Sequence, residues 1–279
     1  MDAIFLKAIQ KNTIWGGERF GLGVGELWLI SAHPNGCCLV LGGEFAGMRL
    51  DDLYAKRGDL FDNKKSFPLL IKLIDAKEDL SLQVHPDNHY AGLHEQSFGK
   101  SESWLMLDCK EGAKIILGHN AKDEKELKSM IEQQKWPELL REVEVFKQDY
   151  FHIPPGTLHA IGAGCFLLEV QQNSDVTYRV WDFDRGRELH TKKALDVLKA
   201  PSKPKASSAN SQSEFFKTNI LTAPCVLSAK EGFLCCVVIE GFGLIKGQRE
   251  LGLWDAFLLP KGEEIELEGE LKLFIASAL

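Results

Sequence analysis

Alternation of hydrophobic and polar residues runs through much of the chain and predicts a mainly β protein. The polar residues Ser81, Gln83 and His85 alternate with leucine and valine, and a period of two places their side chains on one face of a strand. Residues 67–76 form a strongly apolar run that carries one lysine, Lys72. Because a buried ammonium group needs a partner, Lys72 either lies at a sheet edge with its charge in water or points into a pocket.

Helical periodicity is confined to a few segments. Residues 48–57 and 189–200 each predict a short helix, and residues 121–142 predict a charged helical insert that is interrupted at Pro137. The polar segment 87–99 is expected to be a loop. The predicted helices are therefore few, and they lie between strands.

The Ser- and Pro-rich segment 201–213 predicts a linker. After it, residues 214–279 show short strands at regular spacing, which favours a small sandwich or barrel, and they contain no histidine. We therefore expect a first domain over residues 1–200 that carries the chemistry, with the helical insert at about 121–142. The C-terminal β module is expected to lack a metal site.

Composition and charge narrow the classes of function. The 279 residues suffice for one large β-rich domain or two moderate ones, and the net charge of −7 argues against binding to nucleic acid. The N-terminus lacks a signal pattern, and no apolar run reaches the roughly 18 residues of a membrane span. The seven scattered cysteines include no CxxC pair, which is typical of reduced thiols. We expect a cytoplasmic protein.

Two histidines, a carboxylate and an amide are candidates for a metal site. Glu102 follows the strand that carries Gln83 and His85, and His159 follows a Pro-Pro-Gly turn that would hold its ring in place. Nitrogen and oxygen donors of this kind suit a divalent metal, most simply zinc. The alternative is a polar cluster that binds nothing.

Asp175 and Arg179 lie on one face of a later extended segment, together with Thr177. Such a pair can be a surface ion pair worth less than about 1 kcal/mol. It can equally place a permanent positive charge and a carboxylate at an active site. The pattern alone leaves both interpretations open.

Five short motifs resemble, in order and spacing, the type I mannose-6-phosphate isomerases, and most nearly their short bacterial form. The motifs are Phe67-Pro-Leu-Leu-Ile-Lys72, Leu80-Ser-Leu-Gln-Val-His-Pro86, Gly99-Lys-Ser-Glu102, Ile153-Pro-Pro-Gly-Thr-Leu-His-Ala-Ile-Gly162 and Ser174-Asp-Val-Thr-Tyr-Arg179. The resemblance implies a cupin fold, which is a double-stranded β-helix jelly roll. A weak similarity of residues 147–154 to residues 253–260 suggests that the C-terminal module is a smaller, degenerate copy of it.

The resemblance also implies a role for particular residues. It implies one zinc ion per chain, bound by Gln83, His85, Glu102 and His159. The catalytic residues that it implies are Arg179, Lys100 and Asp175. It further implies that Ser81 and Lys72 contact the substrate, with Ser81 at the phosphate.

The implied activity interconverts mannose 6-phosphate and fructose 6-phosphate through a cis-enediol. Zinc would polarise the sugar as a Lewis acid, and Arg179, which stays protonated, would stabilise enediolate charge. Lys100, whose pKa should fall beside zinc and an arginine, and a metal-bound water both remain candidates for the base. The alternatives are a noncatalytic sugar- and metal-binding cupin and an Fe(II) cupin oxidoreductase. We expect a sugar phosphate as the only partner, no nucleic acid or membrane, and a monomer or homodimer.

Overall fold

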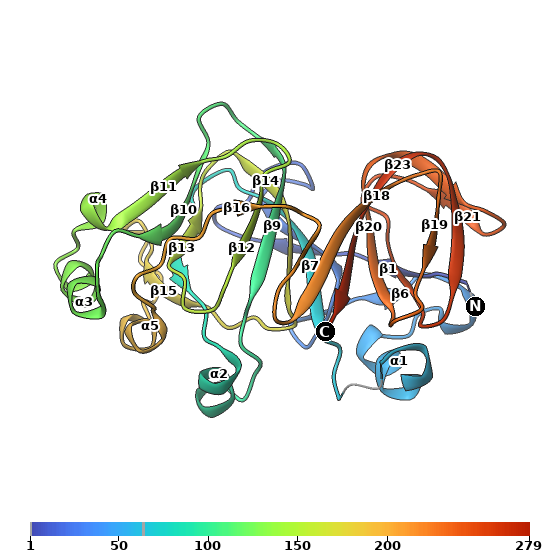
Figure 1. Ribbon diagram of the computed structural model, residues 1–279, viewed down its shortest axis with the longest axis horizontal. Coiled ribbons are helices and arrows are strands. Elements are labelled where there is room, and N and C mark those ends of the chain that lie inside the picture. Colours follow the sequence, from blue (N-terminus) through green and yellow to red (C-terminus); the bar gives the residue numbers. More distant parts are fainter. Residues whose placement is uncertain (1, 63–64) are drawn as a thin grey trace. The chain divides into compact units, whose positions relative to one another are not determined.

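A computed structural model describes residues 2–62 and 65–279 and is mainly β with a few short helices (Figure 1). Strands dominate, as the alternating pattern predicted. The chain divides into two compact units, which are not contiguous in sequence. Unit 1 comprises Met1–Gln10, Leu27–Lys72 and Ala209–Leu279, and unit 2 comprises Lys11–Glu26 and Leu73–Ser208.

This division differs from the expected one, in which residues 1–200 form a single domain. Strand β1 (Ile4–Lys7) pairs antiparallel with β22 (Ala256–Leu259), so the start of the chain completes a sheet of the C-terminal segment. A pairing between residues so distant in sequence leaves no local signal. The later boundary between Ser208 and Ala209 does fall inside the predicted linker.

Unit 1 is built around one large antiparallel sheet. Its strand order is β17-β18-β23-β20-β22-β1-β6, with β19 on β23 and β21 on β20. Its inner face buries an apolar cluster that includes Phe5, Phe257 and Leu267. The remaining elements of this unit are β4 (Ala32–His33), β5 (Gly36–Cys37), β6 (Leu39–Val40), η1 (Gly43–Phe45), α1 (Leu50–Lys56), η2 (Gly58–Leu60), β17 (Ser211–Gln212), β18 (Phe216–Thr222), β19 (Cys225–Ser228), β20 (Leu234–Ile245), β21 (Arg249–Leu251) and β23 (Glu264–Ala278).

Unit 2 contains two sheets whose inner faces share one apolar core. The five-stranded sheet has the order β11-β10-β13-β8-β15, and the other sheet runs β16-β12-β9-β14 and continues through β7, β3 and β2. Trp104 and Leu167 from one sheet and Leu117 and Ile161 from the other belong to the same buried cluster. The strands that lie wholly in unit 2 are β8 (Leu82–Val84), β9 (Glu102–Cys109), β10 (Lys114–His119), β11 (Leu140–Glu144), β12 (Tyr150–Ile153), β13 (His159–Ile161), β14 (Cys165–Gln172), β15 (Tyr178–Trp181) and β16 (Ala206–Ser207). The boundaries between the units fall within β2 (Ile9–Asn12), β3 (Val24–Ile30) and β7 (Leu69–Asp75).

Three helices cover the outer face of the five-stranded sheet (Figure 1). These are α3 (Glu124–Glu132), α4 (Trp136–Leu139) and α5 (Thr191–Val197), which confirm the helices predicted within 121–142 and 189–200. Leu82 and Val84 of β8 pack in the same cluster as the helices. Because side chains alternate along a strand, Gln83 between them points to the inner face of the sheet.

The expected loop over residues 87–99 is wrong in its first half, which forms helix α2 (Asn88–His94). The Asp87 side chain accepts a hydrogen bond from the backbone N–H of Tyr90 and thereby caps the helix N-terminus. Ala91 is its buried residue. So short an amphipathic segment is hidden in a polar sequence, and the capping aspartate is the signal that identifies it.

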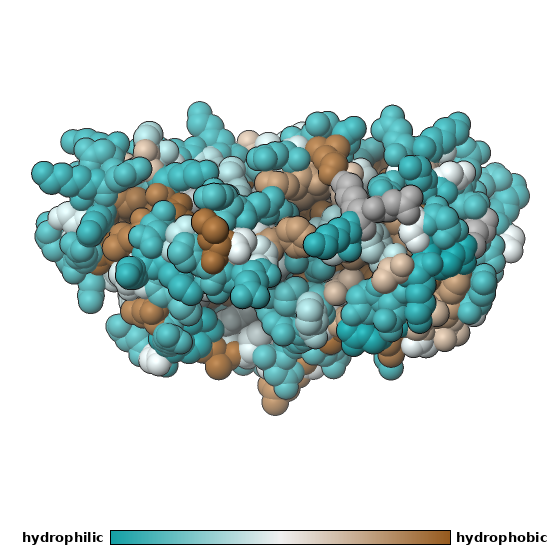
Figure 2. Space-filling view, turned by 90° about the horizontal axis from the view of Figure 1, so that it is seen from below, coloured by the Kyte–Doolittle hydropathy of each residue, from teal (hydrophilic) through white to brown (hydrophobic). Residues whose placement is uncertain are grey.

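Apolar residues are mainly interior. On the face seen in Figure 2, hydrophilic residues cover most of the surface, and hydrophobic ones lie in separate groups between them. Within residues 2–62 and 65–279, no helix has the length and hydropathy needed to cross a membrane.

Candidate metal centre and active site

Three of the predicted metal ligands meet inside unit 2. His85 follows β8, Glu102 begins β9 and His159 begins β13. His85 Nε2 lies 3.4 Å from Glu102 Oε2, and His159 Nε2 lies 3.3 Å from Glu102 Oε1. All three residues are at most 1% exposed, and their ligand atoms lie within 4.8 Å of one another. A buried His/Glu/His group of this geometry could hold a metal ion.

Strand register brings Gln83 and Arg179 to the same interior face. Gln83 lies directly opposite His159 of β13 on one side and opposite Arg179 of β15 on the other. Directly opposed residues of antiparallel strands share a face, so these three side chains form a row across the sheet. The Gln83 amide lies 3.4 Å from His159 Nε2, which places it beside the candidate site.

The Pro-Pro-Gly turn fixes the approach to His159. Gly156 has a φ of 86°, a conformation that favours glycine, and its N–H donates to the His85 carbonyl at 2.9 Å. A Cβ at this position would lie 2.8 Å from the Val197 carbonyl oxygen. The glycine therefore allows the turn to pack closely against its neighbours and ties it to the backbone of a second candidate ligand.

The histidines are oriented as metal ligands usually are. His85 Nδ1 lies 2.9 Å from the Val176 carbonyl, and His159 Nδ1 lies 2.9 Å from the Thr157 carbonyl. Because a carbonyl only accepts, each Nδ1 carries the hydrogen and each Nε2 presents a lone pair. Among the residues that the structure describes, His85 Nε2 and Glu102 Oε1 are buried without a hydrogen-bond partner. A metal ion would satisfy both.

The charge states also fit a metal. Burial, with help from the nearby Lys100, lowers the pKa of His85 to about 3, and burial lowers the pKa of His159 as well. Both rings are therefore neutral near pH 7, as metal ligation requires. Burial alone would raise the pKa of Glu102, but the Lys100 ammonium holds it well below its usual range. Two neutral imidazoles and one carboxylate suit a divalent cation such as zinc.

Lys100 connects the candidate ligands to a residue that the sequence analysis missed. Its Nζ lies 3.0 Å from Glu102 Oε2 and 3.5 Å from Glu169 Oε1. Glu169 is opposite Trp104 in the β14–β9 pairing, and Trp104 Nε1 donates to Glu169 Oε2 at 3.0 Å. The signal was a carboxylate within the apolar run Leu167-Leu-Glu-Val170. The two carboxylates stabilise the positively charged form of Lys100, whereas a nearby metal ion would destabilise that form.

Arg179 is held by the segment that follows β15. Its Nη1 donates to the Glu188 carbonyl at 2.7 Å, and its backbone N–H donates to His190 Nδ1 at 3.1 Å. Burial, together with the positive charge of Arg187, lowers the pKa of Arg179, yet a guanidinium remains charged near neutral pH. A fixed cation therefore lies in the same strand row as Gln83 and His159.

The other predicted site residues lie in different settings. Ser81 is buried directly before β8, and Asp175 is exposed in the connection between β14 and β15. Lys72 lies in β7 and belongs to unit 1, whereas the other predicted site residues belong to unit 2. Lys72 is 6% exposed, so the alternative of an edge position with a solvated charge is wrong.

Comparisons with known proteins agree with this geometry. A family model described as phosphomannose isomerase type I, catalytic domain, matches residues 21–103. The mannose-6-phosphate isomerase ManA of Bacillus subtilis (strain 168) is 39% identical, and the match covers 99% of this chain and 98% of the relative. A mannose-6-phosphate isomerase of Streptococcus mutans is 44% identical over 239 residues, which cover 80% of this chain and 76% of that protein.

Solved structures extend the comparison to the fold. The crystal structure of the Bacillus subtilis mannose 6-phosphate isomerase superimposes with a TM-score of 0.94 at 37% identity, and it covers 99% of this chain and 100% of its own. An Archaeoglobus fulgidus structure, described as a putative mannosephosphate isomerase, has a TM-score of 0.84 at 24% identity over 100% of this chain and 98% of its own, which shows the shared fold. The predicted cupin-type architecture is confirmed. The chain belongs to the type I phosphomannose isomerases, in a bacterial form close to that of Bacillus subtilis.

Proposed function

We propose that the protein is a metal-dependent mannose-6-phosphate isomerase, which interconverts mannose 6-phosphate and fructose 6-phosphate. The observation that carries this conclusion is the buried triad His85, Glu102 and His159 in a chain that matches relatives of this activity over nearly its full length. The substrate is therefore a sugar phosphate. The free cysteines support a cytoplasmic location, and a monomer or homodimer is expected.

The metal is proposed to be one zinc ion, held by His85, Glu102 and His159, with Gln83 as a fourth ligand. Support for Gln83 comes from its amide, which lies 3.4 Å from His159 Nε2 on the interior face. Exchanging the amide N and O assignments of Gln83 would present its oxygen to the same point. When bound, zinc would supply a Lewis acid for the oxygens at C1 and C2 of the sugar.

Arg179 is proposed to stabilise the negative charge that develops when the proton at C2 is removed. The guanidinium is half-buried, where its charge acts more strongly than in water, and the Glu188 carbonyl limits its movement. It cannot serve as the base, because it stays protonated. Asp175, four residues earlier in the chain, is proposed as its acidic partner.

Lys100 is proposed to carry the proton between C2 and C1. In the direction of fructose 6-phosphate, the proton leaves C2, a cis-enediol forms, and a proton is returned to C1. Lys100 can act as the base only after it has released its own proton, and the buried carboxylates of Glu102 and Glu169 then stabilise the ammonium group that forms when it accepts the proton from C2. Ser81 and Lys72 are proposed to bind the substrate, with Ser81 at the phosphate.

The first experiment is a coupled assay for fructose 6-phosphate formed from mannose 6-phosphate. Purified protein is assayed as isolated, after EDTA treatment, and after addition of zinc or of Fe(II). We expect activity to disappear with EDTA and to return with zinc. Absence of turnover in protein that holds stoichiometric zinc would contradict the proposal and leave a noncatalytic binding protein. Oxygen uptake with bound iron would instead support the oxidoreductase alternative.

A further inference from the structure

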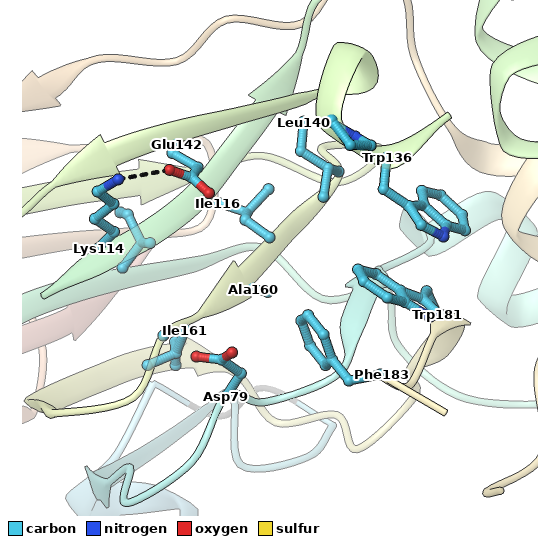
Figure 3. A pocket seen from close by; sticks show the side chains of 13 residues that line it. Asp79, Lys114, Ile116, Trp136, Leu140, Glu142, Ala160, Ile161, Trp181 and Phe183 are labelled. Atoms are coloured by element: carbon cyan, nitrogen blue, oxygen red, sulfur yellow. Dashed lines mark hydrogen bonds and ion pairs between the residues drawn. The ribbon is translucent and has the colours of Figure 1, made fainter. Parts of the chain in front are cut away.

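Figure 3 shows a pocket of about 570 Å³ in unit 2. The pocket lies on the face of the five-stranded sheet opposite to the face that carries Gln83 and His159. Ala160 lines it, and Ala160 follows His159 in β13, so the two side chains point to opposite faces. Ile116 lies opposite both Ala160 and Glu142 in the strand register and also lines the pocket. Strand β13, which carries the candidate metal ligand His159, therefore contributes to the floor of the pocket. The His159 side chain itself lies on the other face of the sheet.

Aromatic rings form one wall of this pocket. Trp136 of α4 stacks on Trp181 of β15, with ring centroids 5.1 Å apart and planes inclined by 10°, and Phe183 lies 4.4 Å from Trp181. None of the three side chains is fully buried. A cluster of large aromatic rings that remains open to solvent is a common sign of a binding surface.

Charged groups lie across the floor from this wall. Figure 3 shows the Lys114–Glu142 pair on the opposite side, with Asp79 below. Lys114 Nζ lies 2.7 Å from Glu142 Oε2, and Asp79 Oδ1 accepts from the Ala163 N–H at 2.7 Å. Glu142 Oε1 and Asp79 Oδ2 can therefore accept hydrogen bonds from a ligand. With two carboxylates and one ammonium group, the lining repels phosphate.

We propose that this pocket is a binding site for a neutral carbohydrate in pyranose form. The C–H face of such a sugar packs on aromatic rings, and its hydroxyl groups donate to carboxylates such as Asp79 and Glu142. The volume lies within the range of small-molecule sites and exceeds that of one sugar ring, so a disaccharide also fits. The negative lining distinguishes this ligand from the phosphorylated substrate of the proposed reaction.

The test is saturation-transfer NMR with methyl α-mannopyranoside and mannobiose on the full, zinc-loaded protein. Saturating fructose 6-phosphate fills the active site, so that sugar binding there is excluded. We expect saturable binding that Trp136→Ala weakens about tenfold, because a stacking surface is lost. Phe146→Ala, which removes an aromatic ring that is 60% exposed outside this pocket, should leave the affinity unchanged.

Asp79→Asn and Glu142→Gln keep the proposal testable if Trp136→Ala disturbs helix α4. Both carboxylates are exposed, so these variants should fold normally and weaken sugar binding about threefold each. Absence of binding by both sugars, or binding that neither the tryptophan nor the carboxylate variants weaken, would overturn the proposal.

Binding of spermidine with exclusion of the sugars would assign the pocket to organic cations instead. Isomerase activity of the three pocket variants should stay within about twofold of the parent, and binding is read independently of turnover.

Discussion

The two units of this chain are both built from antiparallel strands, but they bury different chemistry. Among the described residues, the buried polar side chains of unit 1 are Ser31, Lys72 and Thr218. Unit 2 buries two histidines, two glutamates and a lysine in a single connected group, listed here as His85, His159, Glu102, Glu169 and Lys100. The buried side chains of unit 1 are therefore typical of a structural scaffold, and the buried charged group of unit 2 is typical of a functional site.

The difference shows how a functional centre can be recognised from burial. Removing charged groups from water costs several kcal/mol each, and a stable fold keeps them only when they are paired or bind a metal. In unit 2 each buried charge faces an opposite one, and the two histidines present Nε2 lone pairs to the same point. The apolar cluster of unit 1 carries no comparable electrostatic cost. Apart from Lys72, the predicted site residues thus lie in unit 2, and their separation from the apolar cluster of unit 1 can be tested.

The largest effect is expected from the loss of a candidate metal ligand. His159→Ala should lower kcat/KM by about 10³-fold or more, because a metal ion held by the triad would supply several kcal/mol of transition-state stabilisation. Zinc content, measured by atomic absorption on the purified variant, should fall in parallel.

His119 provides a matched control for that variant. It is also a fully buried histidine of unit 2, and its Nε2 lies 2.9 Å from the Lys199 carbonyl. His119→Gln should retain zinc and turnover even if its stability falls. Equal loss of zinc in both variants would mean that burial of any histidine, rather than this triad, sustains the site.

Arg179→Ala should come next, with kcat lowered by about 10²- to 10³-fold at unchanged zinc content. The reason is the loss of a fixed positive charge at the developing oxyanion. Arg179→Lys keeps a charge but cannot reproduce the planar guanidinium that reaches the Glu188 carbonyl, so it should restore only part of the activity. Full activity of Arg179→Lys would show that orientation by that carbonyl is unimportant.

A core variant of unit 1 should have the opposite profile. Phe257 is fully buried against Phe5, with ring centroids 5.2 Å apart. Phe257→Ala should lower the free energy of unfolding by about 3–5 kcal/mol through lost burial and a cavity. The folded fraction should keep its zinc and its kcat, as judged by denaturant unfolding and by activity per bound zinc. A loss of kcat per bound zinc would remove the distinction between scaffold and site.

Glu169→Gln should give a smaller effect within the site. The amide can still accept from Trp104, but the negative charge 3.5 Å from Lys100 is lost. We expect kcat to fall about tenfold, with little change in KM or zinc content, because Lys100 is less well supported as a proton carrier. A change confined to thermal stability would assign Glu169 a purely structural role.

The sequence predicted local features better than distant pairings. Alternation placed Gln83 and His85 on the polar face correctly, because that rule needs only adjacent residues. Convergence of Glu102 and His159 on His85 depends on the pairing of β8 with β13 and on the packing of their sheet against the sheet that contains β9. No local pattern contains this information, and it was available only through resemblance to a family. The same limit explains why the β1–β22 pairing was missed. Glu169 could have been predicted from the sequence, since a carboxylate within an apolar strand indicates a buried charge that needs a partner.

The smallest effect near neutral pH is the acid sensitivity of metal-free protein, and it should be confined to unit 2. The pKa of His85 is lowered to about 3 from an ordinary 6.5, so the unfolded chain binds its proton first. Stability from the neutral ring is complete above about pH 6.5 and is lost as the pH falls toward 3. Unit 1 contains only His33, which is partly exposed. Hydrogen exchange after EDTA treatment should therefore show β8 and β13 losing protection between pH 6.5 and 4, while β20 and β23 keep theirs. Simultaneous loss in all four strands would mean that the two units unfold as one.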